Sequence, residues 1–459
     1  MNTLTIQQSE TFLIYDERNT GRKKSVLLLL SFFVLGMLAT VLEMQNGLKM
    51  ISLVIALTYL CMMLFLKEEN AFMLLCFLLP CSSLFDNAGF KYLLNFSIFI
   101  FFFRFILLEN PFRKREFYYA LFFLILDLCL LFLKGIFSFS FLLGSGSSFI
   151  SYSLLILYMK RKTDYEINPS FFYIAFFIGV LFSTLSGFLQ SKYAISDLFH
   201  IRQIGLTRDA NYLALFCLLG FFAYDMFFEK GFTFLAWIIK GGFALCGLLT
   251  MSKMFLLMIV VGFLFWIIIN FKKLSEHPAF IAALILFAIV LLGFIYLGAF
   301  DSLFETYLNR FKGGDITTGR IYIAQQFLIQ SSKSPIDLLF GASTGYFDYY
   351  NVVYNAEHMY LHCTYLEVII AYGCVGGVLF YAFFFKILRD FRHSLMTAER
   401  RGYLFPLIIF LIGIAALPML TSDLTPLSLL FLLGSYKAKN QKKEDLRTLI
   451  TVLEEENEL

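Results

Sequence analysis

The chain carries little charge for its length. Only 15% of its 459 residues are Asp, Glu, Lys or Arg, whereas soluble domains carry roughly 25%. Hydrophobic residues make up 59% of the sequence, and the mean hydropathy is +0.76. This composition excludes an ordinary soluble domain and indicates a protein that lies mostly within a membrane.

The chain also lacks the spacings that indicate a metal, redox or nucleotide site. Its eight cysteines are scattered through apolar segments, with no Cys-x-x-Cys pair and no zinc spacing. They are therefore predicted to be small buried hydrophobic residues. No phosphate-binding GxxxxGK[ST] loop occurs, so we expect no cofactor. The net charge of +4 is explained by membrane anchors, so we expect no nucleic-acid partner.

Apolar segments of about 20 residues, the length that crosses a bilayer core, recur along the whole chain. They predict an all-α, polytopic transmembrane helical bundle with about 14 spans. A β-barrel is excluded because barrel strands alternate polar and apolar residues over about 10 positions, which these runs do not. The predicted spans are roughly 25–42, 50–66, 71–85, 92–108, 117–133, 145–159, 170–189, 209–228, 232–249, 253–271, 279–299, 363–385, 403–420 and 424–437.

The distribution of Lys and Arg predicts the orientation, because cytoplasmic loops carry an excess of both. Most of the 37 Lys and Arg residues fall inside if both termini are cytoplasmic. The predicted organisation is then a cytoplasmic segment (1–24), eleven helices (25–299), an extracytoplasmic catalytic loop (300–362), three helices (363–437) and a cytoplasmic tail (438–459). The main inner clusters are Arg22 to Lys24, Arg113 to Arg115, Lys160 to Lys162, and Lys442 with Lys443.

The external loop is about sixty residues long, far beyond the usual connection. After Arg320, the apolar residues Ile321, Ala324 and Leu328 recur at helical spacing and predict a helix on the membrane surface. A Gly/Ser turn at 341–345 follows. Five tyrosines come next, and their rings suit either a bound sugar or an aromatic belt at the interface; they are Tyr346, Tyr349, Tyr350, Tyr354 and Tyr360.

Two of the chain's five histidines, His358 and His362, end this loop. Four residues apart on a helix, they share one face just outside the membrane. Glu367 lies one turn deeper. A metal held by this pair would need Glu357, Glu367 or a distant Asp as third ligand, and we expect none.

Charges deep in the spans need partners, because a charge at mid-bilayer costs about 2.5–3.5 kcal/mol on insertion scales. Asp127 and Lys240 are predicted at similar depths, so we expect a structural pair. Lys240-Gly-Gly242 also suits a broken helix of the kind that transporters use at substrate sites.

Five short motifs in order resemble the bacterial O-antigen and capsular repeat-unit polymerase superfamily, which also contains the O-antigen ligases. They are Gly205-Leu-Thr-Arg-Asp209-Ala-Asn211-Tyr-Leu-Ala, Leu249-Thr-Met-Ser252-Lys253, Thr318-Gly-Arg320, the turn from Gly341 to Gly345, and His362 followed by Gly373 and Gly376. The chain departs from the family pattern at Ala210, where the family has proline, at Lys253, where it has arginine, and at Cys363, where it has Asn, Ser or Gln.

The resemblance implies a multi-pass glycosyltransferase of the bacterial plasma (inner) membrane. A polymerase moves a growing glycan from undecaprenyl pyrophosphate to a new lipid-linked oligosaccharide repeat on the outer face, building O-antigen, capsule or exopolysaccharide. Membrane lipids are the other expected partner. The sequence leaves open whether a polysaccharide chain-length regulator also binds. An O-antigen ligase, or a flippase of lipid-linked glycans, is the alternative.

Side-chain chemistry assigns roles within this scheme. The pyrophosphate leaving group needs cations, and arginine's planar fork suits phosphate oxygens, so Arg320 is the first candidate. Arg208 and Lys253 are further phosphate ligands at outer helix ends.

The acceptor hydroxyl needs a base, and His362 has a suitable pKa range. Glu367 is expected to orient that imidazole or to act as the base itself. His358 and Tyr360 are expected to bind substrate. Asp209 and Asn211 follow Arg208 at a helix start. Asp209 either caps that helix, or it orients Arg208 or contacts sugar hydroxyls. We include Asp209 and Asn211 among the substrate-binding candidates.

Overall fold

The computed structural model describes residues 2–45, 48–108, 115–160, 170–191, 201–228, 234–275, 305, 308–309, 320–354, 361, 363–394, 400–415, 417 and 419–433. All regular elements among them are helical, which confirms the predicted all-α class. The helices are α1 (Asn2–Met44), α2 (Lys49–Phe65), α3 (Glu68–Leu78), η1 (Leu79–Cys81), η2 (Asp86–Ala88), α4 (Leu93–Leu108), α5 (Arg115–Leu133), α6 (Phe139–Lys160), α7 (Ser170–Ser191), α8 (Ala210–Phe227), α9 (Phe234–Leu249), α10 (Lys253–Ser275), α13 (Arg320–Ser332), α14 (Pro335–Phe340), α15 (Tyr346–Tyr354), α16 (Thr364–Ser394), α17 (Arg400–Ile414) and a last helix, Leu424–Leu433.

The apolar runs of the sequence correspond closely to these helices. Each predicted span contains a helix, except 279–299, which lies outside the described residues. Within the described part, four helical segments are long and apolar enough to cross a membrane: Lys23–Met44, Phe139–Met159, Ser170–Ser191 and Thr364–Arg392, the last of which is interrupted at Gly373. The other apolar helices are shorter, so the number of crossings stays a prediction.

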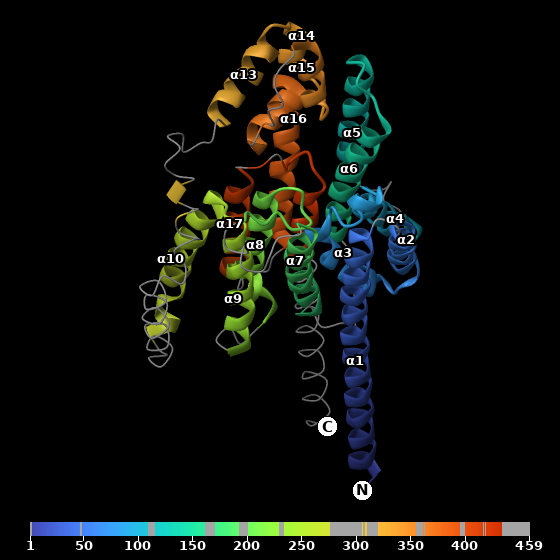
Figure 1. Cartoon of the computed structure of the whole chain (residues 1–459). Helices are drawn as coiled ribbons and strands as arrows, with labels where there is room; N and C mark the ends of the chain where they lie inside the picture. The colour runs from blue at the N-terminus through green and yellow to red at the C-terminus, as the bar shows by residue number, and fades with distance from the viewer. Residues whose placement is uncertain are drawn as a thin grey trace.

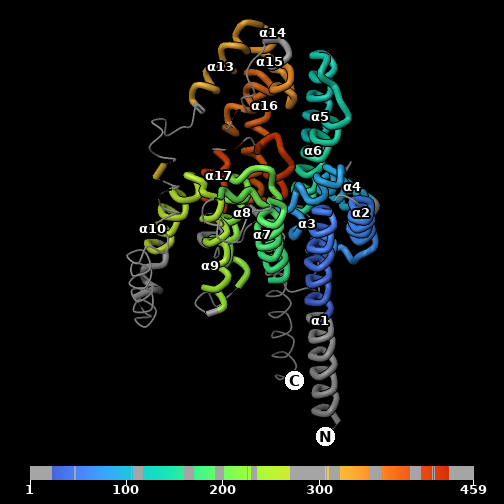
Figure 2. The backbone as a smooth tube through the Cα atoms, viewed as in Figure 1, coloured from blue at the N-terminus to red at the C-terminus, as the bar shows by residue number. Residues whose placement is uncertain are grey.

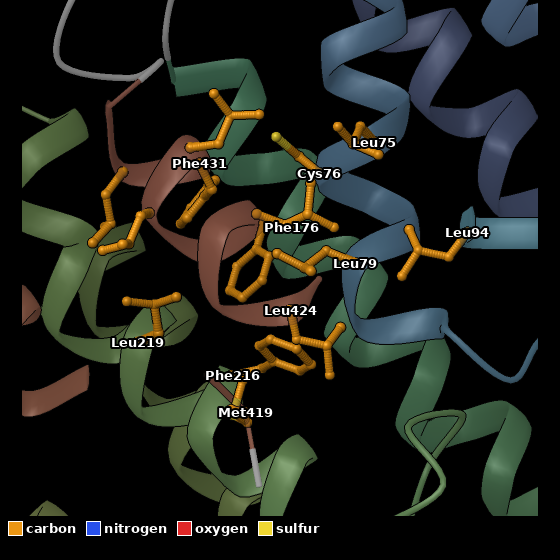
Figure 3. Close-up of a cluster of buried hydrophobic side chains, with 14 of the residues drawn as sticks. Leu75, Cys76, Leu79, Leu94, Phe176, Phe216, Leu219, Met419, Leu424 and Phe431 are labelled. Carbon is orange, nitrogen blue, oxygen red and sulfur yellow. The ribbon is translucent and has the colours of Figure 1, made fainter. Parts of the chain in front are cut away.

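The helices pack through aromatic and aliphatic side chains, which fill the space between them. Figure 3 shows one such cluster, where side chains of α3, α7 and α8 meet the last helix. Phe176 of α7 stacks on Phe431 with ring centroids 4.6 Å apart, and Phe216 of α8 meets Phe176 edge-on at 6.0 Å. All three side chains are buried. Close contact between large rings lets neighbouring helices bury apolar area without polar partners.

The chain is arranged around α7, which packs against α1, α3, α8 and α9. In Figure 1, α13, α14 and α15 gather at one end of the molecule together with the upper part of α5, and α1 begins at the opposite end. The tube in Figure 2 shows α7 to α10 as a group of neighbouring helices. The described part of the predicted external loop therefore forms a helical body of its own at one end.

That helical body has an aromatic centre. Phe327 of α13 meets the rings of Tyr346 and Tyr350 at 5.3 and 5.8 Å, and all three side chains are buried. The prediction that Tyr346 and Tyr350 face a sugar or an interfacial belt is therefore wrong. Their rings form the buried centre that α13 and α15 share.

Helix α13 begins at Arg320, as the sequence predicts. Ile321 and Leu328 are exposed on it, so the predicted apolar face exists. Its position on a membrane surface stays a prediction.

Helix α16 is not one continuous helix but a hairpin of two limbs. Gly373 has φ 66° and ψ −174°, which breaks the helix. The Tyr381 hydroxyl donates to the carbonyl of Tyr365, and the rings of Tyr372 and Phe380 stack at 5.6 Å. In a straight helix, residues sixteen apart lie about 24 Å apart along the axis. The limbs 364–372 and 374–394 therefore fold back on each other.

This hairpin corrects one predicted span. The first limb has nine residues, about 13 Å of helix, whereas a crossing needs about 20 residues. A single uninterrupted crossing over 363–385 is therefore wrong, and only the limb after Gly373 is long enough. The apolar run alone did not reveal the break, because glycine is also common in transmembrane helices.

The Gly341–Gly345 turn lies in the break of α16. The amides of Ala342 and Ser343 donate to the carbonyls of Ile370 and Ala371, at 3.1 and 2.8 Å. A helix break leaves carbonyls without their usual partners, and these amides satisfy two of them. The approach is so close that a Cβ on Gly341 would lie 2.3 Å from the Ala371 carbonyl oxygen. Two separate glycine motifs of the sequence thus meet in one contact.

Asp127 of α5 fixes the same turn. Its carboxylate accepts the amide and the hydroxyl of Thr344, both at 2.8 Å, and the hydroxyl of Ser145 at 2.5 Å. A second anchor lies nearby, where Lys134 after α5 pairs with buried Asp337 of α14. The external helical body is thus attached to α5 and α6 at two polar points.

The predicted pairing of Asp127 with Lys240 is wrong. Helix α5 packs against α6 and α16, whereas α9, which carries Lys240, packs against α7, α8 and α10. Similar depth does not place two residues on the same side of a bundle. The Lys240 ammonium lies 5.0 Å from the ring centroid of Trp266 and 5.2 Å from that of Tyr224, an arrangement that attracts a buried cation. Helix α9 runs unbroken through Gly241 and Gly242, so the predicted broken helix is also wrong.

Candidate active site

Arg208 is presented by a strained turn before α8. Its φ is +65°, a left-handed conformation that is uncommon outside glycine. Its guanidinium donates to both carboxylate oxygens of Asp86, at 2.9 and 3.0 Å, and to the carbonyl of Lys91 at 3.0 Å. About half of the side chain stays exposed (51%). The arginine is therefore held in one orientation with part of its fork still open to a ligand.

Asp209 caps α8. Its backbone is extended, and its carboxylate accepts the amide of Asn211 at 2.7 Å. The guanidinium of Arg202 lies 3.9 Å from the same oxygen. The capping interpretation is confirmed. The proposed orientation of Arg208 by Asp209 is wrong, because Asp86 performs it.

Asn211 joins two helix starts. Its side-chain carbonyl accepts the hydroxyl of Ser252 at 2.8 Å, and Lys253 begins α10 as the next residue. The Gly205–Ala214 and Leu249–Lys253 motifs are therefore neighbours. Asn211 is buried, so its visible role is to hold the two helix starts together.

Glu367 is buried on the first limb of α16 with one oxygen satisfied. Its Oε1 accepts the hydroxyl of Thr421 at 2.8 Å. Its Oε2 has no hydrogen-bond partner within the described part of the chain. One turn before it, the hydroxyl of Thr364 accepts the amide of Met419 at 2.7 Å. The first limb is thus fixed against residues 419–421, with one carboxylate oxygen left to accept a further bond.

Asp423 is a second carboxylate in the same connection. Its Oδ2 accepts the hydroxyl of Ser147 at 3.2 Å and lies 3.4 Å from the amide nitrogen of Asn95. Burial raises the pKa of this carboxyl above its usual range; hydrogen bonds from Ser422 and Ser147 and the charge of Arg208 oppose the rise. Arg208 therefore lies within electrostatic reach of Asp423.

Hydrogen bonds and chain connectivity link these groups in two sets. Glu367 is bonded to Thr421, two residues before Asp423, and Arg208 directly precedes the cap residue Asp209, three residues before Tyr212. Electrostatic interactions of Tyr212 with Glu367 and Asp423, and of Asp423 with Arg208, connect the two sets. We call Arg208, Asp209, Tyr212, Glu367 and Asp423 the polar cluster. It joins the starts of α8 and α16 to the connection before the last helix. A cation and three carboxylates held at one place suit proton transfer and phosphate recognition.

Three predicted site residues, His358, Tyr360 and His362, lie outside the described residues. For Arg320 the structure describes only the backbone, at the first position of α13. The structure places Arg208, Asp209 and Asn211 at the start of α8, beside the start of α10 at Lys253, and Glu367 on the first limb of α16. It leaves the other four assignments untested.

Sequence reasoning missed Asp86, Thr421 and Asp423. Each stands in a short connection that the predicted topology places on the outer side, between spans 71–85 and 92–108 or between 403–420 and 424–437. An acidic residue in so short an outer connection is the signal that would have found Asp86 and Asp423; no such signal marks Thr421. Nothing in the sequence shows that these two connections meet.

Metal binding finds no support within the described ranges. No group of three His, Cys, Asp or Glu side chains there is placed to hold a metal ion. Because the histidine pair lies outside those ranges, the expectation of a metal-free site stays a prediction.

Comparison with known families gives an independent view of the same region. Residues 239–381 match the family model described as O-antigen ligase. The expected resemblance is confirmed: this segment belongs to the O-antigen polymerase and ligase superfamily. The match covers about a third of the chain. The chain matches no curated protein and no solved structure.

Four of the five motifs fall inside the matched O-antigen ligase segment, and the Gly205–Ala214 motif precedes it. The matched segment contains Glu367, the α16 break and the Gly341–Gly345 turn. The likeness to the O-antigen ligase family covers this segment alone, and the apolar helices indicate a multi-pass membrane protein.

Proposed function

We propose that this protein is a repeat-unit polymerase. It transfers a growing glycan from undecaprenyl pyrophosphate to a new lipid-linked oligosaccharide on the outer face of the bacterial plasma membrane. The observation that supports the proposal is the polar cluster. It contains Glu367, which lies inside the O-antigen ligase family segment and has one carboxylate oxygen without a hydrogen-bond partner among the described residues, and the half-exposed Arg208. A base and a phosphate-binding cation are the two groups this transfer needs.

The reaction breaks one bond and forms another. The acceptor hydroxyl oxygen attacks the anomeric carbon of the donor glycan, and the bond from that carbon to the pyrophosphate oxygen breaks. The hydroxyl proton passes to a base of the protein, and undecaprenyl pyrophosphate leaves with the bonding electron pair. Charge grows on the leaving oxygens, where guanidinium groups stabilise it. Arg208 and Arg320 are the proposed donors, with Lys253 as a further cation.

The proposed base is His362, with Glu367 as its partner or its substitute. His362 is two residues before Thr364, so chain connectivity keeps their Cα atoms within about 7.6 Å. The hydroxyl of Thr364 is bonded to the 419–420 connection beside the polar cluster. The free Oε2 of Glu367 is suited to accept a bond from an imidazole N–H or from the acceptor hydroxyl itself. His358 and Tyr360 are proposed substrate ligands.

The test uses purified protein in lipid vesicles with a lipid-linked repeat as the sole substrate and a chelator present. The wild-type protein should produce a ladder of polymer. Glu367→Gln should lower the rate by about 10²-fold or more, the usual contribution of general acid–base catalysis, while donor binding persists. Ser153→Ala, which removes a buried hydroxyl bonded within α6, should leave the ladder unchanged. Unchanged turnover in Glu367→Gln would remove this residue from the chemistry.

A ligase is the second candidate, favoured by the description of the family model itself. A ligase joins finished glycan to a different lipid acceptor and cannot lengthen the repeat. If product forms only when a second acceptor lipid is added, the protein is a ligase and not a polymerase. In cells that lack the gene, loss of the ladder with one repeat retained supports the polymerase, whereas single repeats left on the cytoplasmic face indicate a flippase.

A further inference from the structure

We propose that Asp127 is a positioning residue of the transfer reaction. It locks the Gly341–Gly345 turn into the break of α16 and thereby fixes the limb that carries Glu367. Its side chain is fully buried, and it contributes nothing to the polar cluster directly. The proposal rests on the proposed function, because it assigns a role in that reaction.

The first step is the contact between turn and helix. The break at Gly373 leaves carbonyls of the first limb without helical partners. The turn supplies amides to Ile370 and Ala371, so it takes the place of the missing helical turn. A buried carbonyl without a partner costs about 1–3 kcal/mol, so the turn stabilises the broken end of the first limb, in addition to the bonds that fix this limb to residues 419–421.

The second step is the attachment of the turn. Thr344 follows Ser343 directly, and both its amide and its hydroxyl donate to the Asp127 carboxylate at 2.8 Å. Ser145 of α6 donates to the same carboxylate at 2.5 Å. Because Asp127 lies on α5 and Ser145 on α6, these hydrogen bonds anchor the turn to two helices that pack against each other. The hydrogen bonds that this carboxylate makes to described residues thus join the turn to α5 and α6.

The third step is the distance to the site. Glu367 is three residues before Ile370 on the same nine-residue limb, so a shift of the turn moves both. Misplacing a reacting group by about 1 Å can cost about 10²-fold in rate. Loss of the Asp127 bonds should therefore lower kcat, while KM for the donor should change less, because Arg208 lies outside the external body and is held by Asp86.

The experiment combines hydrogen exchange with kinetics on the full-length protein in vesicles, using wild type, Asp127→Leu, Asp127→Asn and the matched control Ser153→Ala. In Asp127→Leu, the amides of Ala342, Ser343 and Thr344 should lose protection, and kcat should fall by about 10²-fold. Asp127→Asn keeps an oxygen acceptor for the Thr344 amide. This variant should therefore retain most of the amide protection and most of kcat. Ser153→Ala should match wild type in both measurements.

A cross-link separates positioning from simple loss of stability. The hydroxyls of Ser145 and Thr344 lie 3.1 Å apart, so Ser145→Cys with Thr344→Cys can form a disulfide. In the Asp127→Leu background, oxidation should restore amide protection and most of kcat, and reduction should abolish both again. Wild type treated with the same oxidant controls for the native cysteines.

The outcomes are distinct. Unchanged amide protection in Asp127→Leu overturns the proposal, and so does lost protection with an unchanged kcat. Recovery of protection without recovery of rate on oxidation also overturns it. If wild type makes no product from lipid-linked repeats, with or without a second acceptor, the proposed function fails instead.

Discussion

Single residues show how the polar cluster is specified. Arg208 is strained and held by Asp86, Glu367 is buried, and Asp423 is half-buried. Hydroxyl groups donate hydrogen bonds to both carboxylates. Buried carboxylates are costly unless other groups satisfy them. The cluster is therefore maintained at a cost in stability, which is typical of functional sites.

Substitutions of Asp209 test whether this motif residue has only a structural role, the capping of α8. Asp209→Asn keeps a good helix cap and removes the charge, so the stability of the folded protein should stay nearly constant. Asp209→Ala should cost about 1 kcal/mol, measured by thermal unfolding of the purified protein. If Asp209→Asn also retains full polymer synthesis, capping is the whole role of this residue; if synthesis is lost at wild-type stability, the charge itself takes part in the reaction.

Asp423 predicts a pH dependence of stability. Burial raises its pKa, so the folded chain holds this proton more tightly than the unfolded chain, where the pKa is about 3.9. The stabilisation is fully present below that unfolded value and is lost as pH rises through the raised folded value. Asp423→Asn should remove this loss, so its melting temperature should fall less than that of wild type between about pH 4 and pH 7. Parallel curves for the two proteins would contradict the assignment.

At the level of elements, the hairpin of α16 is the feature that most shapes the site. It turns an apolar run into a short limb carrying Glu367 and a long limb after Gly373. The turn of the external body is built into the break. The external segment and the membrane helices are thus one structure at this point, not a loop attached to a bundle.

Gly373→Ala tests the hairpin. Its backbone conformation is open to glycine almost alone, and an added Cβ would lie 2.3 Å from the carbonyl carbon of Leu339. The substitution should destabilise the fold by at least about 1–3 kcal/mol and abolish polymer synthesis. Gly241→Ala in the middle of α9, where a Cβ meets nothing within 4 Å, is the matched control and should be neutral or stabilising by up to about 1 kcal/mol. Equal stability of the two variants would contradict the observed break.

The molecule as a whole places its groups at different heights along the bundle. The α13–α15 body lies at the end opposite the start of α1 (Figure 1), and the polar cluster lies where α8 and α16 begin. The Lys and Arg bias predicts that the α13–α15 end faces outward.

Reporter fusions test that orientation. A reporter inserted after Ser332, at the end of α13, should behave as extracytoplasmic, and fusions after Lys162 and Gln441 as cytoplasmic. The physical reason is the excess of Lys and Arg in loops that stay on the cytoplasmic side. A cytoplasmic signal at Ser332 would end the proposed mechanism, because the lipid-linked repeats are joined outside the membrane.

Composition and periodicity alone determined the membrane class and the positions of most helices. Long apolar runs must form helices in lipid, since every backbone group needs an internal partner there, and this holds whatever the neighbours are. The order of motifs was enough to indicate the superfamily.

Only the tertiary structure decided which groups meet. The break at Gly373, the turn seated in it, and the union of Asp86, Asp423 and Arg208 depend on contacts between segments far apart in sequence. Asp127 and Lys240 show the same limit. The local sequence predicts how deep each residue lies in the membrane, but it does not predict on which side of the helical bundle its helix packs. Which helices become neighbours is decided by packing of the whole chain, and the site exists only after that packing.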